Sequence, residues 1–162
     1  MKEIKYLLTI TIIIITNCAS AESKLSPMQK RQITSRIYDS DYETVYRATL
    51  TVLQDQGYIV KNTDMLSGLI VTEIDRETSK LTQFFQSIFG DVTDKGTLIE
   101  VSCMADKISD NSTELRINIQ ETKYGADGSK QEVNRLYDED TYQQLFNEIR
   151  VEIKRREAIR GK

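Results

Sequence analysis

The strand-like segments of this chain follow one another along the sequence with turns, rather than long helices, between most of them. Four such runs, rich in β-branched and apolar residues, lie at 58–61, 69–74, 98–105 and 115–120. Turn-forming residues separate the first two runs and the last two. Parallel neighbours would need a crossover of a dozen or more residues, usually a helix. The pattern therefore predicts hairpins and an antiparallel sheet.

Two amphipathic helices accompany these strands. Ser40 and Glu43 form a capping-box pattern, apolar residues recur at helical spacing through 45–53, and Gly57 stands where a terminating glycine belongs. A second helix is predicted near the C-terminus, with apolar positions from Tyr142 to Ile153. With a first strand at 33–38 and a last one at 132–137, the predicted order is β-α-β-β-(short α)-β-β-α. The predicted fold class is α+β, a two-layer antiparallel sheet with two main helices on one face, in a single domain over 33–162.

The N-terminus has the pattern of a secretion signal. Lys2 and Lys5 precede about ten uncharged, mostly apolar residues, which are too few to span a bilayer. The segment 15–18 (I-T-N-C) then resembles a bacterial lipobox, in which the cysteine is diacylated and becomes the new N-terminus. We therefore predict a lipoprotein signal peptide at 1–17, and a lipidated Cys18 with a flexible tether at 18–32.

Two features of this leader leave alternatives open. Asn17 stands where Gly, Ala or Ser is usual, and a cut after A-S-A (19–21) would release a soluble periplasmic protein instead. By resemblance to Gram-negative lipoproteins, the residues after Cys18 lack the aspartate that retains such proteins in the inner membrane. The expected destination is the periplasmic face of the outer membrane.

Composition excludes several kinds of chemistry. The chain of 162 residues has no histidine and two cysteines, so it has no His-based catalytic triad, no His-ligated zinc and no four-thiolate site. A net charge of −3 argues against nucleic-acid binding. Cys103 is in phase with apolar strand positions and is expected to be a buried thiol rather than a reactive one. We expect no cofactor, no metal site and no enzymatic activity.

The acidic clusters have structural explanations. The run 138–140 (D-E-D) precedes the last predicted helix, where Asp140 can act as the N-cap. Asp106 and Asp110 lack the spacing of a calcium-binding loop. Neither cluster is predicted to be catalytic.

Two segments are candidates for an interaction surface. Ten residues at 81–90 hold three of the four phenylalanines; as a short helix, this segment either closes over the sheet as core or docks on a partner or the bilayer. The C-terminal basic run either complements the dipole of its helix or contacts anionic lipid or an acidic partner. The candidate residues are Leu81, Phe84, Phe85, Ile88, Phe89, Lys154, Arg155 and Arg156.

The helix at 42–56, the strand entered by G-Y-I-V (57–60) and the turn D-M-L-S-G-L-I (64–70) resemble the helix-grip domains of the BamC (NlpB) lipoproteins. The likeness covers about 33–155 and concerns residues that set the fold. BamC has two such domains and a long N-terminal segment, so its role in barrel assembly is not carried over. We expect a membrane-anchored periplasmic lipoprotein, held by the lipid on Cys18, with a non-catalytic binding or envelope-assembly role and a protein partner. The alternative is a carrier of a small apolar ligand in a cleft between the sheet and the C-terminal helix.

Overall fold

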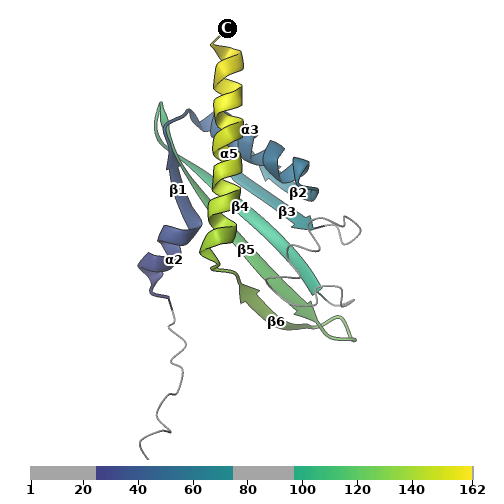
Figure 1. Cartoon of the computed structure of the whole chain (residues 1–162). Helices are drawn as coiled ribbons and strands as arrows, with labels where there is room; N and C mark the ends of the chain where they lie inside the picture. Colours follow the sequence, from purple (N-terminus) through teal and green to yellow (C-terminus); the bar gives the residue numbers. More distant parts are fainter. Residues whose placement is uncertain (1–24, 75–96, 162) are drawn as a thin grey trace, which may run out of the picture.

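The computed structural model describes residues 25–74 and 97–161. Over these residues the chain forms a six-stranded antiparallel sheet with three helices, which confirms the predicted α+β class (Figure 1). The elements are α2 (Pro27–Thr34), β1 (Ser35–Tyr38), α3 (Tyr42–Asp55), β2 (Tyr58–Asp64), β3 (Leu69–Ile74), β4 (Thr97–Ser109), β5 (Ser112–Tyr124), β6 (Lys130–Arg135) and α5 (Glu139–Arg160).

The sheet is organised around β5. The strand order is β1-β5-β4-β3-β2, and β6 also pairs with β5. The predicted hairpin between the last two long strands is confirmed: β4 and β5 pair from Thr97–Lys123 to Ser109–Ser112, with a register shift before Ser109. Both strands run further than apolar alternation indicated, because polar residues continue the ladder at each end.

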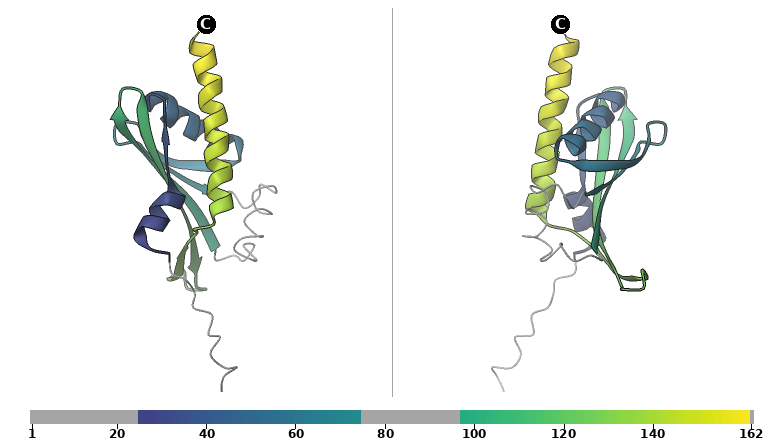
Figure 2. Two further views of the ribbon diagram at one scale, coloured as in Figure 1. Left: turned by 60° about the vertical axis from the view of Figure 1, so that its left-hand side comes forward. Right: turned by 90° about the vertical axis from the view of Figure 1, so that its right-hand side faces the viewer.

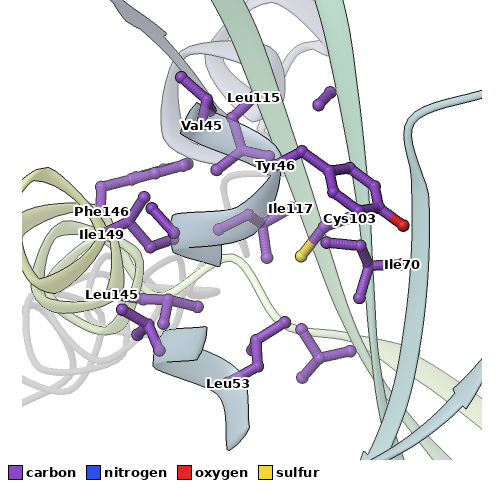
Figure 3. Close-up of a cluster of buried hydrophobic side chains, with 14 of the residues drawn as sticks. Val45, Tyr46, Leu53, Ile70, Cys103, Leu115, Ile117, Leu145, Phe146 and Ile149 are labelled. Carbon is purple, nitrogen blue, oxygen red and sulfur yellow. The ribbon is translucent and has the colours of Figure 1, made fainter. Parts of the chain in front are cut away.

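One face of the sheet carries the core. Side chains on β4 alternate, so that Ile99, Val101 and Cys103 are buried, while the residues between them are more exposed. Helices α3 and α5 lie on this same side of the sheet (Figure 2). Figure 3 shows Phe146 and Ile149 of α5 on the side of the core opposite the strands. Side chains from the two helices and the sheet thus form a single core.

Helix α3 begins one residue later than the capping-box pattern predicted. Asp41, not Ser40, is the N-cap, and its carboxylate accepts from the backbone N–H of Thr44 at 2.9 Å and from the Thr44 hydroxyl at 2.6 Å. Ser40 is buried, and its carbonyl accepts from the hydroxyl of Thr113. The end of the helix is as predicted, since Gly57 follows it with a φ of 88°.

Helix α2 replaces part of the predicted tether and the start of the predicted first strand. Ser26 and Gln29 form a reciprocal capping box, and Pro27 occupies the first turn. Behind this cap, Thr34 is buried and Ile33 packs against the core. Residues 27–32 therefore belong to the folded domain, and β1 begins at Ser35 rather than at Ile33.

Helix α5, in contrast to α3, begins earlier than predicted. Asp138 is the N-cap, accepting from the backbone N–H of Thr141 at 2.9 Å, whereas Asp140 lies within the first turn. Tyr142 then fills a gap in the edge of the sheet between β1 and β6. Its hydroxyl accepts from the N–H of Ile119 at 3.2 Å and donates to the carbonyl of Leu136 at 3.1 Å, while the Leu136 N–H donates to the Ile119 carbonyl.

Candidate interaction surfaces

Part of the predicted site lies outside the described residues. This applies to Cys18 and to the whole apolar segment, namely Leu81, Phe84, Phe85, Ile88 and Phe89. Lipidation of the cysteine and the docking or core role of the segment therefore stay predictions. The C-terminal basic residues, in contrast, have defined surroundings.

Two of the three predicted basic residues hold one buried carboxylate. Arg155 contacts both oxygens of Glu152, with Nε–Oε2 at 2.6 Å and the second bond at 2.7 Å. Arg156 donates from Nε to Glu152 Oε1 at 2.8 Å and from its terminal nitrogen to the Thr51 hydroxyl at 2.7 Å. Lys154 is exposed on the same helix. Arg156 thus joins α5 to α3, and its hydrogen bonds serve this structural contact rather than a partner or lipid.

The end of α5 makes a second link of the same kind. Arg160 donates to the Thr44 hydroxyl at 2.6 Å and to the Asp41 carboxylate at 3.3 Å, at the start of α3. Since Gln56 at the end of α3 donates to Glu148, the two helices run antiparallel. We call the contacts of Glu152, Arg155, Arg156 and Arg160 the helix clamp. Local sequence patterns do not reveal it, because the partners on α3 are about a hundred residues away in the chain.

A groove of about 510 Å³ follows the outer side of this helix pair. It is lined by Val52, Asp55, Gln56, Asn147, Glu148, Val151 and Glu152. Three of these residues are acidic, and Val151 is well exposed. Because Arg155 and Arg156 hold the Glu152 carboxylate, the groove offers Asp55 and Glu148 beside the exposed Val151.

A second groove, of about 530 Å³, separates α2 from β1. It is lined by Met28, Arg31, Gln32, Ser35, Arg36, Ile37 and Glu114. We call it the α2–β1 groove. Sequence reasoning missed this groove because residues 27–32 were expected to be tether. The pattern S-P-x-Q at 26–29 is the signal that indicates the helix.

Basic and apolar side chains meet in the α2–β1 groove. Arg31 contacts the Glu114 carboxylate at 3.2 Å, and the Arg116 guanidinium lies 3.7 Å from the same carboxylate. Arg36 donates to the carbonyls of Gln32 and Ser35 and lies over the ring of Phe146. Two guanidinium groups, those of Arg31 and Arg116, therefore flank the Glu114 carboxylate, while Arg36 lies over Phe146. Basic side chains thus outnumber acidic ones at this site.

Cys103 is a packing residue, as predicted. Its side chain is 1% exposed, and Figure 3 shows its sulfur near Ile117 and Ile70. Burial raises the pKa of the thiol to about 12. Such a thiol stays protonated and is a poor nucleophile.

The acidic clusters are used structurally where the structure describes them. Asp110 pairs with Lys107 at 2.7 Å, and this contact lowers the pKa of its carboxyl. Asp138 caps α5. Within 25–74 and 97–161, no three acidic or thiol side chains come close enough together to hold a metal ion.

Side chains fill the space between α5 and the sheet, where the alternative prediction placed a ligand. Tyr142, Phe146 and Ile149 are each at most 1% exposed, and Leu145 and Ile153 are also buried. Their partners on the strands include Val101, Ile117 and Ile119, which are buried to the same degree. Over this stretch of α5 the contact with the sheet is packed core.

Over the residues that the structure describes, the fold is an α+β domain with an antiparallel sheet, two helices on its core face, and the grooves described above. A scan against protein-family models gives no match for the chain, and a search among curated proteins gives none either. Among the helices that the structure describes, none is long and apolar enough to cross a membrane.

Proposed function

We propose that this protein is a membrane-anchored lipoprotein of the bacterial periplasm, with a lipid on Cys18 and one non-catalytic domain that binds an envelope partner. The observation that carries the proposal is the leader: two lysines, an uncharged apolar run of signal-peptide length and a cysteine directly after it. Several acyl chains on one residue are enough for stable anchoring. The residues after the cysteine favour the outer membrane.

The position of α2 supports this proposal. Residues 19–26 separate Cys18 from α2, the first helix in the part of the chain that the structure describes. At roughly 3.5 Å per residue, they reach about 28 Å when fully extended. A domain on so short a tether stays at the membrane surface, where it meets partners that are themselves bound to the envelope.

The surroundings of the charged residues support a binding role rather than catalysis. Cys103 is buried with a raised pKa, and Glu152 and Asp138 serve the helix clamp and a helix cap. Catalytic groups need a pKa matched to their reaction and a position facing a substrate. The described carboxylates with a shifted pKa instead face their own hydrogen-bond donors.

The experiment is cross-linking in intact cells followed by mass spectrometry, which reports the N-terminus and the partners together. We expect an acylated N-terminal Cys18 and a cross-linked envelope protein. Cys18→Ala should abolish incorporation of a labelled fatty acid into the protein. The matched control is Cys103→Ala, which removes the other cysteine and should leave this incorporation unchanged.

Two results would contradict the proposal. The first is an unacylated N-terminus after Ala21. The second is a Cys18→Ala protein that still incorporates the labelled fatty acid as the unchanged chain does.

A further inference from the structure

We propose that the α2–β1 groove and the outer side of α2 form the surface on which the tethered domain rests against anionic lipid headgroups. This inference rests on the proposed lipid anchor at Cys18. It adds an orientation: one defined side of the domain faces the bilayer, and the opposite end faces the periplasm.

The first argument is charge. The segment from Pro27 to Tyr38 has three basic residues, Lys30, Arg31 and Arg36, and no acidic one. The whole chain, in contrast, has a net charge of −3. The Arg31 side chain is 64% exposed and can therefore contact a headgroup. The one carboxylate in the groove, Glu114, has both Arg31 and Arg116 beside it. Anionic headgroups attract such a surface.

The second argument is apolar exposure at the same place. Met28 is 73% exposed and Ile37 is 62% exposed, and both line the α2–β1 groove beside Arg31. A surface that binds at the headgroup boundary combines cations with apolar side chains that enter the acyl layer. Single exposed apolar residues are common in proteins, but here two of them line one basic groove.

The third argument is reach. Residue 26 lies at most about 28 Å along the chain from Cys18, and α2 begins at the next residue. Helix α5 has 22 residues and is therefore about 33 Å long. Figure 1 shows α2 beside the first turns of α5, with the C-terminus at the far end. The tether therefore favours the α2 end for contact with the bilayer.

Another exposed apolar residue lies at the opposite end. Leu66 is 99% exposed in the turn between β2 and β3. This turn is held to the start of α3 by Tyr42, which donates to the Met65 carbonyl. The start of α3 is in turn joined to the C-terminal end of α5 by Arg160. Leu66 is therefore a matched site that should stay in water when α2 contacts lipid.

The test places a fluorescent side chain at each end. The chain has no tryptophan, so Met28→Trp and Leu66→Trp each give one reporter. The full gene is expressed, and the anchored protein is purified and reconstituted in phosphatidylethanolamine–phosphatidylglycerol vesicles with brominated acyl chains. We expect blue-shifted and strongly quenched emission from position 28, and several-fold weaker quenching from position 66. Equal quenching at the two positions would overturn the proposal.

A second comparison tests the role of charge. In the Met28→Trp protein, Arg31→Glu should remove most of the quenching, and so should vesicles of phosphatidylcholine alone. The matched control is Arg47→Glu on α3, whose side chain is 53% exposed and also pairs with a glutamate. It should leave the quenching unchanged. Circular dichroism of each variant distinguishes loss of membrane contact from unfolding. If Arg31→Glu leaves the quenching unchanged in a folded protein, the charge argument is contradicted.

The anchor can be supplied chemically, so that failure of the proposed function is seen separately. If mass spectrometry finds an unmodified Cys18, its thiol is coupled to a maleimide lipid; buried Cys103 does not compete. If the chain is cut after Ala21, Glu22→Cys supplies the thiol. The quenching in vesicles then tests the orientation of the domain whether or not the cell acylates Cys18.

Discussion

Gly68 lies in the turn from β2 into β3, with a φ of +79°. A Cβ at this position would lie 2.1 Å from the carbonyl oxygen of Ala105. The Gly68 carbonyl itself accepts from the Ala105 N–H at 3.0 Å. The glycine therefore allows β4 to run directly beside the turn.

We expect Gly68→Ala to lower the free energy of unfolding by about 2 to 5 kcal/mol, since it combines left-handed backbone strain with an overlap that the strands must relieve. Gly128 is the control. It has a similar φ of +78°, but a Cβ there has nothing within 4 Å. Gly128→Ala should cost only about 1 kcal/mol. Urea denaturation measures both, and equal losses would show that the close approach to Ala105 has no cost.

The hydroxyl of Tyr142 serves two backbone groups at the gap between β1 and β6. Burial raises the pKa of this side chain to about 12, so the hydroxyl keeps the proton that it donates to Leu136. Removing it by Tyr142→Phe leaves the buried N–H of Ile119 without its acceptor.

We expect Tyr142→Phe to destabilise the protein by about 1 to 3 kcal/mol. Tyr38→Phe is the comparison, because its hydroxyl donates at 2.9 Å to the Phe146 carbonyl inside α5, where the helix already supplies a donor. We expect Tyr38→Phe to lower the free energy of unfolding by about 0.5 to 1.5 kcal/mol. Urea midpoints in the reverse order would contradict the bridging role of Tyr142.

At the scale of elements, the helix clamp makes the packing of α5 on α3 depend on pH. Hydrogen bonds from Arg155, and then from Arg156, lower the pKa of Glu152 below its ordinary 4.5, against the effect of burial. A carboxyl whose pKa is lower in the folded state stabilises the fold above its unfolded value. It loses that contribution as the pH falls through the folded value.

We therefore expect Glu152→Gln to destabilise the protein by about 1 to 2 kcal/mol at pH 7 and to make less difference below the ordinary carboxyl range. Glu157→Gln, on an exposed position of the same helix, is the control and should have little effect at either pH. Urea midpoints measured from pH 7 down to pH 3 check this. A difference between Glu152→Gln and the unchanged protein that stays constant with pH would contradict a lowered pKa for Glu152 in the folded state.

Elements with strong periodicity were predictable from sequence, and the exceptions have physical reasons. α3 and α5 carry long apolar stripes, and β4 and β5 alternate clearly. α2 has only eight residues and a polar composition, so its stability depends on the Ser26 cap and on contacts with distant elements. The N-cap of α3 was misplaced because Ser40 and Asp41 can both cap. Asp41 serves because its carboxylate binds Thr44 and also Arg160.

The candidate surfaces were less predictable than the elements. The α2–β1 groove combines Met28, Ile37 and Glu114, which meet only when the sheet has formed. The C-terminal cations were found from sequence, but not their partners on α3. A site built from residues far apart in the chain can be predicted only when the topology is known, and local sequence patterns do not give the topology.

At the scale of the whole molecule, two ends of the domain differ in chemistry. The α2 end has the groove in which Arg31 and Arg116 flank Glu114. The opposite end has the turn with Leu66, the start of α3 and the end of α5. A protein anchored beside α2 would present this second end, and the groove between α3 and α5, to partners in the periplasm.

The pairing of β1 with β5 also bears on how the chain is made. β1 ends at Tyr38, and the residue opposite it is Thr113, about 75 residues later. At a synthesis rate of roughly 5 to 20 residues per second, β1 exists for about 4 to 15 s before its neighbour emerges. During that time its open edge can pair with other chains. The newly made chain thus passes through a period in which β1 has no partner strand of its own, and this period ends only when β5 has been made.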